Sequence, residues 1–165
     1  MIKRRKLGEH TISPRVPMNT GKRERVKLYD LLNSVEEFTS EYLRGAVTYG
    51  TDITDADGFL TTSPTGLAYA IRLLVSHTAD TGLVNLFFTK EEDSLIISMT
   101  WDFFAMPDTD AQMAVKRALV EAGFEVAFDL KGIYAKIKVD STRALQLYSV
   151  PPRVIKSALY TTFFV

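Results

Sequence analysis

The chain has no cysteine, two histidines and one tryptophan among its 165 residues. The lack of cysteine excludes disulfide bonds, thiolate metal sites and a cysteine nucleophile. No apolar run approaches the roughly 20 residues that a membrane span requires. The N-terminal sequence MIKRRKLGEHTISP is charged and lacks the apolar stretch of a secretory signal. We therefore expect a cytoplasmic protein of a reducing compartment that makes no membrane contact.

Glycine is missing from a long internal stretch, because none occurs between Gly82 and Gly123. A glycine-rich loop that cradles phosphate through its backbone therefore cannot form there. The sequence also lacks a P-loop, a GxGxxG motif, a Ser-His-Asp arrangement and the Cys/His spacing of a zinc site. Asp52, Asp55 and Asp57 lack the register of a calcium loop and are typical of a turn. These absences favour a binding role over catalysis.

Charge is distributed unevenly, although the formal net charge is zero. Residues 1–27 contain nine lysines and arginines against two glutamates, a local net charge of +7, so the rest of the chain carries −7. We expect an extended or disordered basic arm over residues 1–26. This arm is either a solvated tail or a segment that steers the chain to nucleic acid, to an acidic protein or to its own acidic face. Its basic residues are Lys3, Arg4, Arg5, Lys6, Arg15, Lys22, Arg23 and Arg25.

Apolar residues at three- and four-residue spacing predict three helices, and alternating residues predict strands between them. Ser63-Pro64 and Asp108 are typical of helix starts, and Gly123 stands where a left-handed cap belongs. The expected helices run from Leu28 to about Gly45, from Pro64 to Gly82 and from Asp108 to Gly123. The expected strands lie near residues 47–53, 83–89, 94–101, 124–128 and 133–139.

This order of elements, with tight hairpins between consecutive strands, predicts an α+β fold. We expect a two-layer α/β sandwich over residues 27–139, in which helices cover one face of a mixed sheet. Residues 140–165 form a C-terminal extension whose last residues are apolar and aromatic. This extension either packs back onto the domain or meets a partner.

Four segments together resemble a known family. The first is ERVKLYDLL at 24–32, which looks like the lead-in to the family's first helix. The others are LAYAIRLLVSHTADTGLVNLFF at 67–88, SLIISMTW at 94–101 and AVKRALVEAGFEVAFDLKGIYAKIKV at 114–139. They look like its asparagine-bearing helix, the strand before its Asp-x-Gly-x-Gly turn, and its closing helix and hairpin. The chain thus resembles the ATP-binding domain of the superfamily that includes sensor histidine kinases, gyrase and MutL (the GHKL type), which implies a Bergerat-like fold.

The family's nucleotide site uses residues that this sequence lacks. Its magnesium-binding asparagines match Leu73 and His77, and neither side chain suits a cation that prefers oxygen ligands. Its adenine-binding aspartate falls at Trp101, with Asp102 one position out of register on the strand. The connection from Trp101 to Ala111 is too short for the family's ATP lid. The resemblance therefore implies a fold whose ATP site has been lost.

Large side chains stand where the family has glycines, because Phe103 and Phe104 follow the strand. We therefore expect a degenerate, noncatalytic pseudo-ATPase that binds a protein in bacterial phosphosignalling or transcriptional control. The resemblance implies a response regulator or a kinase as partner, and a homo-oligomer is left open. We expect no catalytic residue, metal or cofactor. The expected partner-binding residues, at the former nucleotide face, are His77, Trp101, Phe103, Phe104 and Met106.

Two alternatives stay open at this stage. The chain is a nucleotide-binding ATPase or kinase-like protein with an atypical site for ATP and magnesium, or it binds nucleic acid through the basic arm. Protection by ATP would favour the first alternative, and steeply salt-dependent binding would favour the second.

Overall fold

A computed structural model describes residues 22–78, 83–140 and 149–162 of the chain. None of the described helices is long and apolar enough to cross a membrane. The strands are β1 (Glu24–Lys27), β2 (Val47–Thr51), β3 (Phe59–Thr62), β4 (Val84–Glu91), β5 (Ser94–Trp101), β6 (Glu125–Asp129) and β7 (Gly132–Lys138). The helices are α2 (Leu28–Tyr42), α3 (Pro64–Ser76), α4 (Thr109–Glu121) and α5 (Pro152–Thr162), with a 3-10 turn η1 (Phe103–Ala105).

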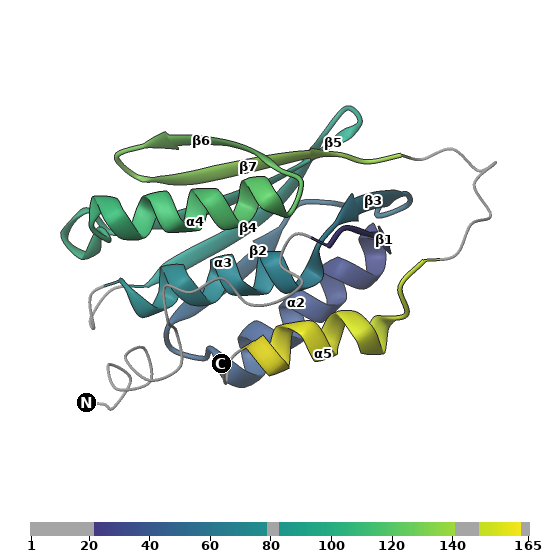
Figure 1. Cartoon of the computed structure of the whole chain (residues 1–165), viewed down its shortest axis with the longest axis horizontal. Coiled ribbons are helices and arrows are strands. Elements are labelled where there is room, and N and C mark those ends of the chain that lie inside the picture. Colours follow the sequence, from purple (N-terminus) through teal and green to yellow (C-terminus); the bar gives the residue numbers. More distant parts are fainter. Residues whose placement is uncertain (1–21, 79–82, 141–148, 163–165) are drawn as a thin grey trace.

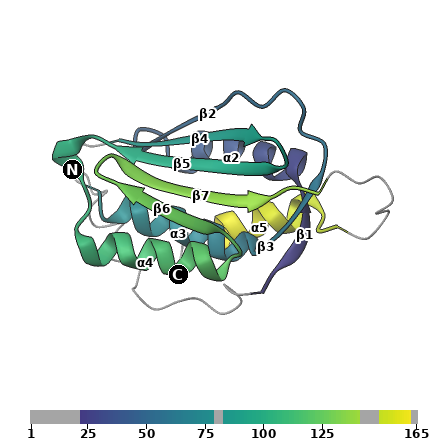
Figure 2. The ribbon, with the colours of Figure 1, turned by 90° about the horizontal axis from the view of Figure 1, so that it is seen from above.

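The main sheet has five strands in the order β2-β4-β5-β7-β6. β2 and β4 pair in parallel, and the other three neighbouring pairs are antiparallel. Figure 2 shows these strands side by side above the helices. The parallel pair arises because α3 lies in the connection between β2 and β4, whereas tight turns join β4 to β5 and β6 to β7. The mixed sheet expected from the sequence is confirmed.

The four described helices lie on one side of this sheet (Figure 1). α3 packs against α4, and α5 packs against both α2 and α3. Ser63 begins α3 as expected, because its Oγ accepts a hydrogen bond from the Gly66 N–H at 2.9 Å. The α+β fold with helices on one face is therefore confirmed.

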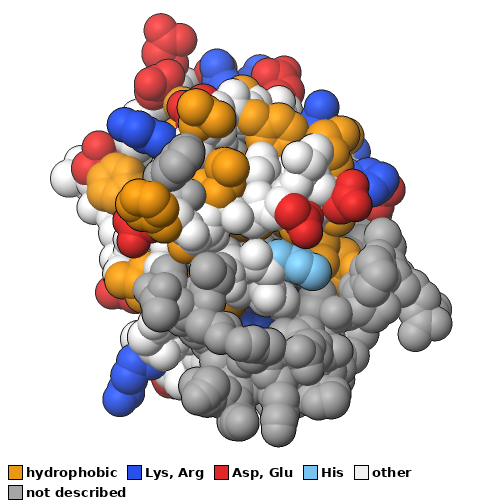
Figure 3. Space-filling view, turned by 90° about the vertical axis from the view of Figure 1, so that its left-hand side faces the viewer, with side chains coloured by type: hydrophobic (Ala, Val, Ile, Leu, Met, Phe, Trp, Pro, Cys, Tyr) orange, Lys and Arg blue, Asp and Glu red, His pale blue; other side chains and the backbone are white. Residues whose placement is uncertain are grey.

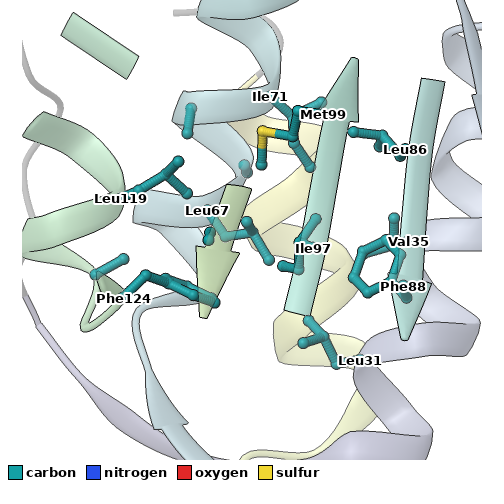
Figure 4. Packing of buried hydrophobic residues seen from close by; sticks show 14 of the residues in the cluster. Leu31, Val35, Leu67, Ile71, Leu86, Phe88, Ile97, Met99, Leu119 and Phe124 are labelled. Carbon is teal, nitrogen blue, oxygen red and sulfur yellow. The ribbon is translucent and has the colours of Figure 1, made fainter. Parts of the chain in front are cut away.

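The hydrophobic core fills the space between the helices and the sheet (Figure 4). Alternating residues of β4 and β5 face inward, and the helices present one apolar stripe each, as their spacing predicts. Burying each large aliphatic or aromatic side chain contributes roughly 1.5–3 kcal/mol to the free energy of unfolding. The labelled core residues are Leu31, Val35, Leu67, Ile71, Leu86, Phe88, Ile97, Met99, Leu119 and Phe124.

The N-terminal boundary differs from the one expected. β1 pairs antiparallel with β3 in a second, two-stranded sheet, and its Val26 is fully buried. The sequence analysis assigned residues 24–26 to the arm and predicted no definite strand at residues 59–62. Four residues carry too short an alternation to reveal a strand, and β1 is fixed by pairing with a segment more than 30 positions away.

The helix α5 binds the C-terminal segment to the body of the domain. Ile155 and Leu159 are buried in the core. The Tyr160 hydroxyl donates a hydrogen bond to the Glu41 carboxylate at 2.7 Å, and Lys156 forms an ion pair with Glu37 at 2.7 Å. Of the apolar residues noted at the C-terminus, those at 163–165 lie outside the described residues.

Candidate partner-binding surface

Two positions singled out in the sequence lie at the C-terminal end of α3. Leu73 is 1% exposed and belongs to the hydrophobic core. His77 is exposed and follows the last helical residue, with its backbone N–H donating to the carbonyl oxygens of Leu73 and Leu74. A ligand cannot reach the Leu73 side chain without opening the core, so the fold does not present Leu73 and His77 as one site.

Trp101 ends β5 and joins it to the turn between β6 and β7. Its indole is 5% exposed, and Nε1–H donates a hydrogen bond to the Leu130 carbonyl oxygen at 3.2 Å. Its backbone N–H donates to the Lys131 carbonyl oxygen at 3.1 Å. Trp101 is therefore part of the buried core at the end of β5, and it offers little exposed area to a partner. The neighbouring Asp102 is exposed, and its carbonyl oxygen accepts from the Ala105 N–H at 2.8 Å.

The turn η1 carries a large aromatic side chain into solvent. Phe104 is 95% exposed, and Met106 is 40% exposed two residues later. Ala105, between them, is buried and holds η1 against the domain. The side chain of Phe103, which the sequence analysis also singled out, lies outside what the structure describes. A phenylalanine side chain this exposed leaves a large apolar area on the surface, and Phe104 is therefore a candidate contact residue.

Three further exposed apolar residues lie at the same end of the sheet. Leu130, in the β6–β7 turn, is 69% exposed, Met113 on α4 is 45% exposed and Leu83 before β4 is 39% exposed. β4 begins beside the end of β5, because Val84 pairs with Trp101. β6 runs back along α4, which brings the β6–β7 turn near the start of that helix. We call Leu83, Phe104, Met106, Met113 and Leu130 the apolar end surface.

Sequence reasoning missed Leu83, Met113 and Leu130. Leu130 carried a usable signal, because it stands in the turn of a predicted hairpin, where polar residues and glycine are usual. Leu83 and Met113 carried none, since single apolar residues at element ends occur on any soluble protein. Only the packing of distant segments reveals that they belong to one surface.

Polar contacts fix the backbone under this surface. Asp129 Oδ1 accepts hydrogen bonds from the N–H groups of Lys131 and Gly132 at 2.8 and 3.0 Å, which holds the β6–β7 turn. A Cβ atom on Gly132 would lie 2.5 Å from the Met99 carbonyl oxygen, so the strands approach closely only because this residue is glycine. Leu130 is therefore presented on a rigid turn.

The start of α4 is equally well ordered. Asp108 Oδ1 accepts a hydrogen bond from the Ala111 N–H at 2.8 Å, as a helix cap does. The Gln112 side chain donates to the Pro107 carbonyl oxygen at 2.7 Å. These contacts hold the segment that carries Met106. The carboxylates of Asp108 and Asp110 occupy the N-terminal end of α4, where an incoming phosphate would be repelled.

Figure 3 views this end of the molecule and shows how the side chains are distributed. Hydrophobic side chains occur over the upper and left parts of the face, and acidic side chains and a histidine lie among them. Among the described residues, no group of three or more histidine or carboxylate side chains could hold a metal ion. Exposed apolar side chains interspersed with polar ones make this end a candidate contact area for a protein.

The basic arm divides into two parts. Lys3, Arg4, Arg5, Lys6 and Arg15 lie outside the described residues, as does Gly21. The Arg23 guanidinium donates to the carbonyl oxygens of Val120 and Glu121 at the end of α4. The Arg25 guanidinium lies 4.0 Å above the ring of Phe59, in a cation–π contact. These two arginines are therefore part of the domain surface.

Comparison with known proteins gives matches among solved structures alone. No protein-family model and no curated protein sequence matches this chain. The catalytic domain of the histidine kinase ThkA is 14% identical, with a TM-score of 0.46 over 73% of this chain and 98% of that chain. The ATP-binding domain of PrrB from Mycobacterium tuberculosis gives the same identity, TM-score and coverage. The chain resembles the ATP-binding domains of sensor histidine kinases.

Two further similar structures are longer pieces of such kinases. The cytoplasmic segment of the histidine kinase QseC is 18% identical, with a TM-score of 0.44 over 73% of this chain and 80% of that chain. ThkA in complex with the response regulator protein TrrA is 9% identical, with a TM-score of 0.43 over 75% of this chain and 43% of that chain. These similarities assign no activity to this chain.

Proposed function

We propose that this chain is a noncatalytic protein-binding module and that the apolar end surface is its binding face. The observation that carries the proposal is the exposure of Phe104, 95% in solvent, on a turn held by a buried alanine. Aromatic anchors surrounded by smaller apolar residues and a polar rim dominate the binding energy of protein interfaces. Phe104 and Leu130 are the two anchors, and the methionines supply adaptable surface around them.

The chemistry of this face favours protein binding over nucleotide binding. Leu73 lies in the core, where a nucleotide site of the resembled family would need a polar ligand. The sequence offers no glycine between Gly82 and Gly123 for a phosphate loop, and Asp108 and Asp110 place negative charge at the start of α4. We therefore propose that the fold is retained for binding and that ATP hydrolysis has been lost.

The partner that fits this proposal is a protein of bacterial phosphosignalling, because the sequence resembles sensor-kinase domains. A response regulator is the first candidate, and a kinase is the second. The face has an apolar centre with acidic residues Asp102 and Asp110 at its edge, so a complementary partner surface is apolar with a basic rim.

The test uses the full chain and purified receiver domains encoded by the same genome, with affinities measured by calorimetry. Phe104→Ala combined with Leu130→Ala removes both anchors, and we expect the affinity for the cognate receiver domain to fall about a hundredfold, a typical loss for two hot-spot residues. Val120→Ala combined with Val154→Ala is the matched control, because both valines are exposed, at 44% and 38%, away from this face. The control should bind within about twofold of the parent chain, well below the roughly 1 kcal/mol that marks an energetically important contact.

Thermal unfolding of both double variants checks that the fold is intact. Equal affinities for the two double variants would contradict the assignment of the binding face. Failure of the parent chain to bind any receiver domain or kinase would contradict the partner class. A rise of several degrees in the unfolding midpoint with millimolar ATP and magnesium would instead favour a nucleotide-binding protein, since a ligand stabilises only a state that binds it.

A further inference from the structure

A concave site lies away from the apolar end surface, between α2 and the connection from β2 to β3. This pocket has a volume of about 570 Å³. One wall is the N-terminal half of α2, and the other is β2 with residues 53–57. In Figure 2 this connection runs from the edge strand β2 around the end of the sheet to β3. No part of the proposed binding face contributes to the pocket.

The walls of the pocket are aromatic and acidic. Tyr29, 61% exposed, and the half-buried Tyr49 supply two rings. Glu36, Asp55 and Asp57 supply three carboxylates, and no lysine, arginine or histidine is among the described residues that line the pocket. Aromatic faces and carboxylates in one concave site both attract a cation, the former through the ring quadrupole and the latter through charge.

The carboxylates of the pocket have no cationic partner within the described part of the chain. The one side-chain contact of Asp55 in the pocket is local, because its Oδ1 accepts a hydrogen bond from the Asp57 N–H at 3.1 Å. Burial, and to a smaller extent the negative charge of Glu36, raises the pKa of Tyr49 to about 12. The field of Glu36 therefore acts on the interior of the pocket, where a bound cation would offset it.

The loop wall is held in place through its backbone. Lys90 Nζ donates to the carbonyl oxygens of Asp55 and Asp57, at 3.2 and 3.5 Å. At its start, Thr51 Oγ1 donates to the Phe88 carbonyl oxygen and accepts from the Ile53 N–H, at 2.8 and 3.0 Å. The pocket is thus largely formed before a ligand arrives, which lowers the entropy cost of binding.

We propose that this pocket binds a lysine or arginine side chain of the chain's own basic N-terminal segment, residues 3–6. A lysine or arginine side chain carries a cation at the end of an apolar stem. Its stem would contact the rings of Tyr29 and Tyr49, and its charge would lie near the carboxylates of Glu36 and Asp57. This site is independent of the apolar end surface and of the proposed function. Occupied by the segment, it would bring the four basic side chains of Lys3, Arg4, Arg5 and Lys6 to the acidic body of the domain.

The charge of the N-terminal segment and its length both support residues 3–6 as the ligand of the pocket. Residues 1–27 carry the basic excess of the chain and the remainder carries the acidic excess, so the two parts attract each other. Lys22 is the first described residue, and 16 positions separate it from Lys6. An extended segment of that length spans roughly 50 Å, more than the width of a domain of this size. The segment can therefore reach the pocket, and its covalent attachment raises its effective concentration there.

The test uses a fluorescein-labelled peptide of residues 1–10, MIKRRKLGEH, and full-length chain in which Lys3, Arg4, Arg5 and Lys6 are changed to glutamine. Peptide binding is measured by fluorescence anisotropy at low ionic strength. Glu36→Gln combined with Asp57→Asn should weaken binding about tenfold or more, because two charges that face the cation are removed. The matched control is Glu121→Gln combined with Glu125→Gln, which removes the same charge from exposed positions on α4 and β6.

Each outcome decides the proposal. A tenfold loss in the pocket variant, with less than about twofold loss in the control, supports binding in the pocket and not diffuse attraction. Equal losses in the two variants, or no binding of the peptide, would overturn it. The native chain must also bind the peptide more weakly than the neutralised chain, because its own segment competes. Equal affinity in those two chains would overturn the assignment to the chain's own segment and leave a separate basic polypeptide as the ligand.

Discussion

The indole Nε1–H of Trp101 donates a hydrogen bond to the Leu130 carbonyl oxygen, at 3.2 Å. This contact joins the end of β5 to the β6–β7 turn, so that an exposed leucine is anchored through its backbone to a buried tryptophan. The donor is part of the core, and the acceptor belongs to the proposed binding face. A substitution that breaks this contact should therefore change both the stability of the fold and the proposed binding face.

Replacing Trp101 with phenylalanine should weaken both the fold and the partner interaction. The variant keeps an aromatic ring but leaves the Leu130 carbonyl without its donor, and a lost hydrogen bond with reduced packing costs about 1–3 kcal/mol. Chemical unfolding measures the stability change. Leu130→Ala is the control, because its exposed side chain can be shortened with a change in stability within about 0.5 kcal/mol. Equal destabilisation by the two substitutions would show that the hydrogen bond contributes nothing.

Restoring the asparagine of the resembled family at Leu73 should destabilise the chain without creating nucleotide binding. Leu73 is buried in the core, and an amide there loses apolar contacts and lacks water, at a cost of about 3–5 kcal/mol. His77→Asn is the matched substitution at an exposed position, and it should change stability by less than about 0.5 kcal/mol. Thermal unfolding with and without ATP and magnesium measures both effects. A stable Leu73→Asn variant that gains protection from ATP would refute the interpretation of a lost site.

The ionisation of Tyr49 should make the chain less stable in strong alkali. Burial and Glu36 raise the pKa of Tyr49 from 10.0 to about 12, so the folded state favours the neutral phenol. The stabilising contribution is complete below pH 10 and is lost as pH rises from 10 to about 12. The difference in absorbance at alkaline pH between the parent chain and Tyr49→Phe isolates this group. Glu36→Gln should lower the pKa of Tyr49, whereas Glu125→Gln should leave it unchanged.

Alanine substitutions at two glycines with positive φ distinguish the cost of backbone strain from the cost of a steric clash. At Gly45, with φ +85°, an added Cβ would meet no atom within 4 Å, whereas at Gly58, with φ +112°, a Cβ would lie 2.6 Å from Val139 Cγ1. Gly45→Ala should cost about 1 kcal/mol from the left-handed backbone alone. Gly58→Ala should cost more, because β3 and the chain after β7 must also separate. Equal costs, measured by chemical unfolding, would contradict the contact between Phe59 and Asp140 that the structure shows.

The elements of this fold could largely be predicted because their signals are local. The spacing of apolar residues predicts α2, α3 and α4, and Ser63 and Asp108 predict where two of those helices begin, since a side-chain oxygen satisfies a free backbone N–H. The alternation in β5 and the turn after β6 predict the antiparallel strands. The resemblance to sensor-kinase domains was available at the same stage, because it depends on the order of these elements.

The candidate sites depended on contacts that no local pattern records. The sequence singled out Phe104 and Met106, yet it ranked the buried Trp101 with them, because residue type does not reveal burial at the end of a strand. β1 exists only through pairing with β3, and the pocket walls come from α2 and a loop more than 15 residues later.

The sequence by itself determined where α2, α3, α4 and the strands of the main sheet lie, the lack of a glycine-rich phosphate loop and the separation of charge between the N-terminal segment and the rest of the chain. Only the tertiary structure decided that Leu83, Met113 and Leu130 are exposed at the same end of the sheet as Phe104, and that Tyr49 and Glu36 line the same pocket. The physical reason is that helix and strand patterns arise from neighbours in the chain. A surface or a pocket is made by packing segments that are distant in the chain, and burial is a property of that packing.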